Sequence, residues 1–334
     1  MGSKRERRAA RAAPDGDRRL AFLEEAREYT PYLGVEAGGA TFLIATDDRG
    51  VDRHLFLKQA RPEFRVLSRA VGMVEILTGE EAIAGRQLVD VGANIGTTTV
   101  HALVSLRFGS AVSCEPHEES FRLLMANVAL NGLVDRVRPL RVAVSNGAGR
   151  AQLAVLKGRM GASWIAVDRD KIRKAQAARA EPAEIGVVDV ETVTLDGLTD
   201  AGLIDRERLG MVWIDVEGHE GHVLEGAGTL AERGVPIVLE FHPRGLAERG
   251  DAARVHSLAE QCYTHFVDIR RPRPGQQRFE LEPVAELRRL GEQLLDTPDP
   301  GRFTDVLLMR LDAGQAKAGA NLPELVRSRR AKAG

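Results

Sequence analysis

Apolar residues recur along the chain with two spacings, and each spacing predicts a different element. Within 118–130, Phe121, Leu124 and Val128 return every three or four positions, as on one face of a helix, and 97–108 shows a similar pattern. Short apolar runs predict buried strands at 88–91, 111–115, 137–144, 211–215, 236–240 and, as a closing pair, 264–269 and 304–309. This alternation predicts an α/β fold with a mostly parallel seven-stranded sheet and helices on both faces.

The pattern divides the chain into four parts. These are a disordered basic tail at 1–19, a small N-terminal cap at 20–84, a main domain at 85–312 and a flexible basic tail at 313–334. The cap is expected to hold a helix at 20–29, a hairpin of strands at 41–46 and 51–57, and a helix from Pro62. In the main domain we expect two extra strands, at 151–156 and 187–195, around an exposed helix or loop at 168–184.

The composition of the chain argues against several classes of binding partner. The 334 residues include 47 Lys and Arg against 48 Asp and Glu, a net charge of -1, whereas proteins that bind nucleic acid over a wide surface are strongly basic. Cys114 and Cys262 are too few for a disulfide framework or a four-cysteine zinc site. The chain shows neither a bilayer-spanning apolar run nor a secretory signal. We therefore expect a cytoplasmic protein without a membrane partner.

The segment 88–99 is the strongest candidate for ligand binding, because a buried strand runs through a glycine-rich turn into a helix. Gly92 and Gly96 let the backbone turn sharply and let a ligand approach closely. The N–H groups at the helix start, around Gly96 and Thr97, attract a carboxylate or a phosphate.

Asp90 distinguishes between the ligands that use such a turn. The turn G-A-N-I-G has one residue too few between its outer glycines for the dinucleotide pattern G-x-G-x-x-G. A carboxylate here is unfavourable beside a pyrophosphate but favourable beside the ammonium and sulfonium groups of S-adenosylmethionine. The pattern therefore favours S-adenosylmethionine over a dinucleotide, and a tight turn without a ligand is the plainer alternative.

Two later positions extend the predicted cofactor site. Glu115 ends the second strand, about 20 residues beyond the turn, where an acid can accept hydrogen bonds from both ribose hydroxyls. Ala143 follows the third strand and is placed to line the adenine. The alternatives are an acidic strand end that faces water and a small residue that only packs.

A second candidate segment, W-I-D-V-E-G-H-E at 213–220, follows the fourth strand and opens a helix. Ligands of open α/β sheets bind outside the carboxyl ends of the strands. The fourth strand should neighbour the first, so we expect Asp215 close to the reactive methyl group. The residues that we expect to converge in one cleft are Asp215, Glu217, His219, Glu240 and His242.

Two kinds of chemistry are open to this cleft. Its side chains can hold a hydroxyl and accept its proton, or Asp215, Glu240 and His242 can bind a divalent metal. The alternative explanation for Glu217 is a favourable contact of an acid with the N-terminal end of a helix.

With these segments in order, the chain resembles the FkbM-type S-adenosylmethionine-dependent methyltransferases over about residues 85–310. The matching blocks are D-V-G-A-N-I-G at 90–96, S-C-E-P at 113–116, R-V-A-V-S at 141–145, V-T-L-D at 193–196, I-D-V-E-G-H-E at 214–220 and V-L-E at 238–240. The resemblance implies a Rossmann-like class I methyltransferase fold and a cofactor loop made by Asp90, Gly92, Asn94 and Gly96. Members of the family are mostly O-methyltransferases that act on hydroxyls of polyketides, sugars, other glycans or lipids.

Three functions follow as hypotheses. The first is O-methylation of a small-molecule, glycan or metabolite acceptor, with Asp215 as base or metal ligand and Glu217, Glu240 and His242 assisting. The second is methylation of RNA or protein with the basic tails as electrostatic arms, although the absence of an N-P-P-[YF] tetrapeptide after the fourth strand makes nucleic-acid amines a less suitable target. The third is a non-catalytic protein that binds S-adenosylmethionine.

Overall fold

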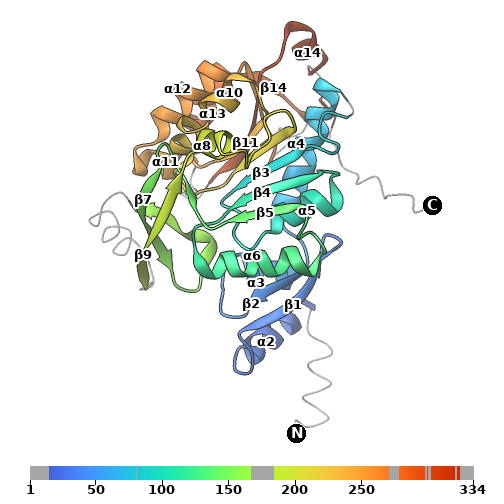
Figure 1. Cartoon of the computed structure of the whole chain (residues 1–334), viewed down its shortest axis with the longest axis vertical. Helices are drawn as coiled ribbons and strands as arrows, with labels where there is room; N and C mark the ends of the chain where they lie inside the picture. Colours follow the sequence, from blue (N-terminus) through green and yellow to red (C-terminus); the bar gives the residue numbers. More distant parts are fainter. Residues whose placement is uncertain are drawn as a thin grey trace, which may run out of the picture.

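The computed structural model describes residues 15–79, 81–166, 184–270, 278–297, 299, 302–319 and 322–323. Its central element is an eight-stranded sheet (Figure 1). The strands are β3 (Gln87–Val91), β4 (Ser110–Cys114), β5 (Val137–Leu140), β10 (Leu209–Ile214), β11 (Ile237–Phe241), β12 (His265–Asp268), β14 (Leu281–Pro283) and β15 (Thr304–Met309). In space they follow the order β14-β12-β15-β11-β10-β3-β4-β5.

The sheet is parallel from β11 to β5 and antiparallel at its other edge. β10 pairs in parallel with both β3 and β11, which confirms the predicted neighbourhood of the first, fourth and fifth strands. β12 and β15 form the predicted closing pair and run antiparallel. The sheet has eight strands rather than seven, because β14 is a three-residue edge strand, too short to leave an apolar pattern in the sequence.

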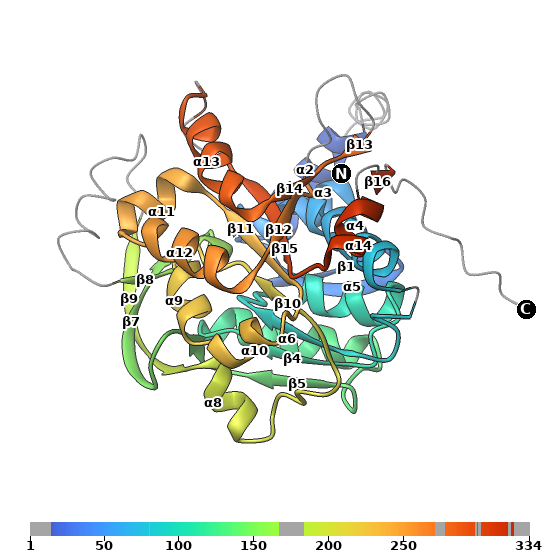
Figure 2. The same cartoon turned by 90° about the horizontal axis from the view of Figure 1, so that it is seen from above.

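Helices cover both faces of the sheet, as predicted, because successive side chains of each strand point to opposite faces. Leu88 and Trp213 face α4 (Pro62–Thr78), α5 (Thr97–Ser105) and α6 (Glu118–Leu130). Val89 and Ile214 face the other layer, which contains α8 (Leu195–Asp200), α9 (Glu220–Glu225), α10 (Gly228–Glu232), α11 (Pro243–Arg249), α12 (Ala252–Cys262) and α13 (Leu287–Leu295) (Figure 2).

The predicted hairpin of the N-terminal part has a different partner strand. β1 (Tyr32–Ala37) pairs antiparallel with β2 (Ala40–Ala45) around Gly38 and Gly39, whose φ angles are 59° and 83°. Positive φ at both positions defines a tight two-residue turn that suits glycine. The Gly-Gly pair is a sequence signal for this hairpin that the prediction did not use.

The predicted strand at 51–57 is wrong, because this segment forms the helix α3 (Val51–Lys58). Leu55, four positions after Val51, is fully buried, and the buried Asp52 accepts a hydrogen bond from the N–H of Ala45 at 2.6 Å. The first helix among the described residues, α2 (Asp15–Ala26), begins within the predicted disordered tail, whose residues 1–14 lie outside them.

Two asparagines, Asn127 in α6 and Asn131 at its C-cap, attach the hairpin to the main domain. Asn131 accepts the N–H of Thr41 at 3.0 Å and donates to its carbonyl at 2.7 Å. Asn127 bonds Leu43 in the same way, at 2.6 and 3.1 Å, and also donates to the carbonyl of Ile95 in the glycine turn at 2.8 Å. Each amide replaces the backbone of a neighbouring strand, so these contacts join the hairpin, α6 and the glycine turn.

A four-stranded sheet lies beside the large one, in the order β6 (Ala143–Val144), β9 (Ile185–Val193), β7 (Gly149–Leu156) and β8 (Trp164–Ala166). The antiparallel pairing of β7 and β9 confirms the two predicted extra strands. The predicted third strand, 137–144, is divided, because β5 belongs to the large sheet and β6 to the small one. Of the predicted segment 168–184, only Glu184 lies within the described residues.

The remaining elements are short. They are the 3-10 helices η1 (Met160–Ala162) and η2 (Val284–Glu286), the helix α14 (Ala313–Ala318) and the paired strands β13 (Arg278–Phe279) and β16 (Leu322–Pro323). The rest of the predicted C-terminal tail lies outside the described ranges. Among the helices in those ranges, none has the length and apolar composition needed to cross a membrane.

Candidate functional site

The glycine turn connects β3 to α5 with three residues in the left-handed region. Gly92, Asn94 and Gly96 have φ angles of 84°, 50° and 86°, which glycine and asparagine adopt most easily. A Cβ on Gly92 would lie 1.9 Å from the carbonyl oxygen of Asp215. The two candidate segments of the sequence therefore touch at this point, where a side chain would separate them.

Asp90 is fully buried beneath this turn. One of its oxygens accepts a hydrogen bond from the hydroxyl of Thr99 at 2.5 Å, and that hydroxyl lies 2.7 Å from the hydroxyl of Ser113. Burial raises the pKa of Asp90 to about 6. The observed contact anchors the first turns of α5, and a direct contact of Asp90 with a positively charged ligand stays a prediction.

Glu115 lies on the other side of the turn, immediately after β4. Its carboxylate accepts the N–H of Asn94 at 2.9 Å through one oxygen and the N–H of His117 at 2.8 Å through the other. Burial raises the pKa of Glu115 to about 7, although both hydrogen bonds favour the charged form. Since a carboxylate has about four acceptor positions, Glu115 can accept two more hydrogen bonds from a ligand.

A cavity, the first cavity, opens at Glu115 between the glycine turn and the small sheet. Gly92, Asn94 and Ala143 line it, as predicted for a cofactor site. Its apolar walls include side chains from the small sheet, namely Leu153, Trp164 and Ile165. A carboxylate beside apolar walls suits a nucleoside, which has a pair of hydroxyls and a flat base.

A second cavity adjoins the first. Residues that line both cavities are Gly92, Asn94, Gly161, Asp215 and Glu217. At these shared residues, a ligand bound in the first cavity would contact a ligand bound in the second.

The predicted reaction residues lie around the second cavity. The structure brings four of the five residues expected in one cleft, Asp215, Glu217, Glu240 and His242, to its lining. His219 lines the first cavity instead. Thr97, predicted for the cofactor, lies at the second cavity, in the first turn of α5.

Asp215 directly follows β10, and Glu240 is the last but one residue of the neighbouring β11, where Ile214 pairs with Leu239. Burial is the main cause that raises the pKa of both carboxyls well above their ordinary values. Nearby carboxylates add to this effect, Glu217 for Asp215 and Asp215 for Glu240. A carboxyl with a raised pKa is a stronger proton acceptor once it is ionised.

Sequence analysis missed several residues of the second cavity. Val51, Arg61 and Glu63 come from the N-terminal part, and Phe303 comes from the segment before β15. These positions are distant in sequence from the glycine turn and belong to no motif. The packing of the N-terminal part against the sheet brings Val51, Arg61 and Glu63 to the site, and the position of β15 brings Phe303.

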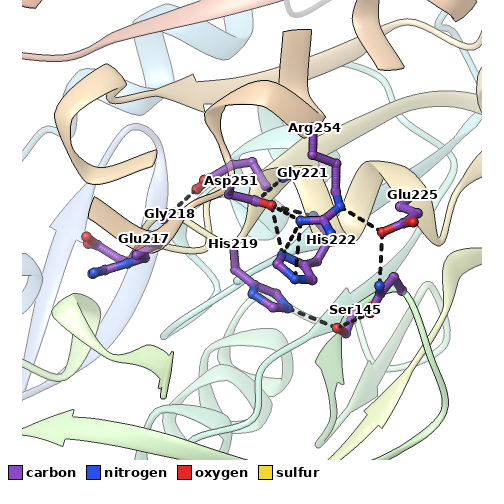
Figure 3. A network of polar contacts seen from close by, with 12 residues as sticks. Ser145, Glu217, Gly218, His219, Gly221, His222, Glu225, Asp251 and Arg254 are labelled. Carbon is purple, nitrogen blue, oxygen red and sulfur yellow. Dashed lines mark hydrogen bonds and ion pairs between the residues drawn. The ribbon is translucent and has the colours of Figure 1, made fainter. Parts of the chain in front are cut away.

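A polar network anchors the loop between β10 and α9 (Figure 3). The buried Asp251 accepts the N–H of Gly221 at 2.6 Å and lies 2.9 Å from Nδ1 of His222. Arg254 donates to the same carboxylate at 2.6 Å. Glu220, fully buried, accepts the N–H of Gly218 at 3.0 Å. These contacts fix the backbone of the loop that carries Glu217 and His219.

His219 connects this polar network to the first cavity. Its ring stacks on that of His222, with centroids 4.1 Å apart, and its Nε2 lies 2.9 Å from the hydroxyl of Ser145 (Figure 3). Burial lowers the pKa of His219 to about 4, so the ring is neutral at physiological pH. A neutral imidazole adds no positive charge to the first cavity.

The metal candidates do not form a ligand set in the described ranges. There, no group of three or more His, Cys, Asp or Glu side chains is arranged to hold a metal ion. Asp215, Glu240 and His242 line one cavity but are not such a group. A metal on these residues stays a prediction that needs their side chains to rearrange.

Comparison with known proteins identifies a family. A model described as the methyltransferase FkbM domain matches residues 90–271, more than half of the chain. Methyltransferase sdnD of Sordaria araneosa is 30% identical over 156 residues, which cover 42% of this chain and 59% of that protein. Hexuronic acid methyltransferase AglP of Haloferax volcanii is 27% identical over 163 residues, which cover 49% and 59%.

The chain thus spans less than two thirds of the length of these two relatives. Among solved structures, a methyltransferase FkbM from Methylobacillus flagellatus aligns with 67% of this chain and 43% of that chain. The sequence identity is 14% and the TM-score is 0.34.

Proposed function

The chain belongs to the FkbM family of methyltransferases, and on this premise we propose that it transfers the methyl group of S-adenosylmethionine to a hydroxyl of a small-molecule or sugar acceptor. The observation that carries the proposal is the junction of two cavities at Asp215 and Glu217. One cavity suits a nucleoside, and the other is lined by carboxylates that can accept a proton. The name of the Haloferax relative, a hexuronic acid methyltransferase, supports a sugar acceptor.

The residues of the first cavity fit the cofactor. Glu115 would accept hydrogen bonds from the two ribose hydroxyls, and the apolar wall at Ala143 would hold the adenine. The N–H groups of the glycine turn and of Thr97 would attract the carboxylate of the cofactor. When bound, S-adenosylmethionine supplies a methyl group on a positively charged sulfur.

Asp215 is the proposed proton acceptor, because it lies at the junction and because burial raises its pKa toward the range in which a general base works best. Glu217, Glu240 and His242 would orient the acceptor hydroxyl. The protein then gains rate mainly by holding the hydroxyl and the methyl group in line, as positioned reactants do in general.

RNA is a less suitable acceptor than a small hydroxyl compound. Of the described residues that line the second cavity, four carry carboxyl groups and one, Arg61, is an arginine, so the lining offers few cations to a phosphate backbone. The described cysteines Cys114 and Cys262 are free thiols.

Calorimetry and turnover test the proposal in two steps. S-adenosylhomocysteine is titrated into the full chain, and its formation from S-adenosylmethionine is then followed with a panel of sugars and hydroxylated metabolites. We expect binding in the first step and turnover on at least one hydroxyl acceptor in the second. Absence of binding would refute the cofactor assignment, and binding without any turnover would favour the non-catalytic alternative.

A further inference from the structure

Arg249, the last residue of α11, contacts two parts of the site, although it is not among the described residues that line either cavity. Its guanidinium carbon lies 5.3 Å from the ring centroid of Trp164, which lines the first cavity. Its Nε donates a hydrogen bond to the backbone carbonyl of Glu217 at 2.5 Å, and Glu217 lines both cavities. One half-buried side chain therefore joins the wall of the first cavity to the junction of the two.

The backbone of Glu217 has a conformation that its residue type rarely adopts. Its φ angle is 56°, in the left-handed region, and the following Gly218 has a φ of 93°. A residue other than glycine is strained in this region and stays there only where the surrounding structure holds it. The conformation therefore requires contacts that fix the peptide group between Glu217 and Gly218.

Both ends of that peptide group are held. The carbonyl of Glu217 accepts the hydrogen bond from Arg249, and the N–H of Gly218 donates to the buried Glu220 at 3.0 Å. A Cβ on Gly218 would lie 2.5 Å from the Cδ of Arg249, so the arginine approaches the loop closely where glycine leaves space. Glu220 belongs to the same segment as the peptide group, whereas Arg249 comes from another helix. Arg249 therefore fixes the loop against α11.

The other contact of Arg249 is with the wall of the first cavity. Trp164 lies on β8, the three-residue edge strand of the small sheet, where it pairs with Ala154 of β7. A cation above the face of an indole ring is attracted by the electrons of the ring, and the planar guanidinium of arginine also stacks on it. Arg249 thus gives this short edge strand a further attachment, and the attachment holds the ring that faces the first cavity.

From these contacts we infer that Arg249 is a positioning residue for methyl transfer, which holds Trp164 against the cofactor and Glu217 in its left-handed conformation at the junction of the cavities. The inference rests on the proposed function and adds to it a residue that acts through two others. Because one guanidinium makes both contacts, its loss should weaken the cofactor site and loosen the junction loop together.

Calorimetry with S-adenosylhomocysteine and the full chain measures the effect on the first cavity. Arg249→Met keeps the length of the side chain but has neither donor nor charge, and we expect the affinity to fall by about tenfold. Trp164→Leu keeps an apolar side chain without a ring and should lower the affinity by a similar factor. Because Arg249 acts in part through Trp164, the double variant should bind more tightly, by about threefold or more, than the product of the two single losses predicts.

Hydrogen–deuterium exchange of the ligand-free chain measures the effect at the junction. In Arg249→Met, the backbone amides of 216–220 should exchange about tenfold faster or more, since the peptide group has lost the donor that holds it. Arg249→Lys keeps a charged donor but not the planar guanidinium, so it should restore slow exchange more fully than it restores the affinity. Arg244→Met is the matched control, because Arg244 is exposed on the same helix, and it should change neither measurement.

Each other outcome has a definite meaning. An affinity of Arg249→Met within about twofold of the wild type, or unchanged exchange at 216–220, overturns the inference. Losses that simply multiply in the double variant refute an action through Trp164. Faster exchange over the whole chain shows general destabilisation and overturns the positioning role. If the wild type does not bind S-adenosylhomocysteine, the proposed function fails, and the exchange at 216–220 still decides whether Arg249 holds the loop.

Discussion

The carboxylate of Glu115 accepts a hydrogen bond from the backbone N–H of Asn94, 2.9 Å away, and so joins the end of β4 to the glycine turn. Glu115→Ala removes this bond and the proposed acceptor for the ribose hydroxyls. We expect the affinity for S-adenosylhomocysteine to fall by about 10- to 100-fold, since hydrogen bonds to a charged group contribute roughly 1.5–3 kcal/mol. Calorimetry measures this change. The control Glu118→Ala, at an exposed ion pair, should bind as the wild type does.

Buried carboxyls make the ligand-free protein more stable in mild acid. Burial raises the pKa of Glu115 and of Glu220 from 4.5 to about 7. Between pH 4.5 and 7 these two carboxyls therefore hold more protons in the folded protein than in the unfolded chain, so their contribution to the free energy of unfolding falls as the pH rises through this window. Urea denaturation should give a lower stability at pH 7.5 than at pH 5, by about 1–3 kcal/mol.

Glu115→Gln tests whether Glu115 causes this pH dependence of stability, because glutamine keeps the shape of the side chain but does not titrate. The difference in stability between the two pH values should shrink in this variant. An unchanged difference would assign the slope to other groups and would contradict the raised pKa of Glu115.

Gly92 and Gly39 have nearly the same φ, 84° and 83°, but different surroundings. A Cβ on Gly92 would lie 1.9 Å from the carbonyl oxygen of Asp215, whereas a Cβ on Gly39 meets nothing within 4 Å. Gly39→Ala should therefore cost only the backbone strain of about 1 kcal/mol. Gly92→Ala should cost roughly 3 kcal/mol or more and abolish binding of S-adenosylhomocysteine. Equal losses of stability would mean that the close approach is not what requires glycine.

The sheet and its ligand edge could be predicted from sequence because their signals are local. The apolar runs gave β3, β4, β10 and β11, and general rules for parallel sheets then placed Asp215 beside Glu240. The segment 51–57 was misassigned because four apolar residues in seven suit a strand as well as a helix. The segment is buried against the rest of the N-terminal part of the chain, and this packing favours the helix.

The wall of the second cavity could not be predicted in this way. Arg61 and Glu63 reach Asp215 through the packing of α4 on the sheet, and Phe303 reaches it from beyond the matched domain. Such contacts depend on tertiary structure, and neither spacing nor residue type in the sequence indicates them. Asp251 is a further case, since its role depends on the first turn of α9, which it contacts 30 residues earlier.

Asp251 does not line either described cavity, yet its carboxylate fixes the loop that does (Figure 3). Asp251→Ala leaves the N–H of Gly221 and the ring of His222 without their buried acceptor, which costs roughly 1–3 kcal/mol. We expect a weaker affinity for S-adenosylhomocysteine, by about tenfold, in calorimetry. Asp251→Asn keeps an acceptor oxygen for Gly221 and should recover most of it. If Asp251→Ala binds normally, the loop does not need this anchor.

Asp215 is the residue whose replacement separates binding from reaction. Asp215→Asn keeps the volume of the side chain but cannot accept a proton, so turnover should fall by about 100- to 10,000-fold, the usual contribution of a general base. The affinity for S-adenosylhomocysteine should stay within about threefold of the wild type, since Glu115 and the apolar wall are untouched.

In the wild type, turnover should rise with pH as the carboxyl at position 215 loses its proton, because its pKa is raised. This rise should disappear in Asp215→Asn, whereas Asp135→Asn, at an exposed position, should keep it. Full turnover with an unchanged pH profile in Asp215→Asn would place the base elsewhere in the second cavity, with Glu240 the next candidate.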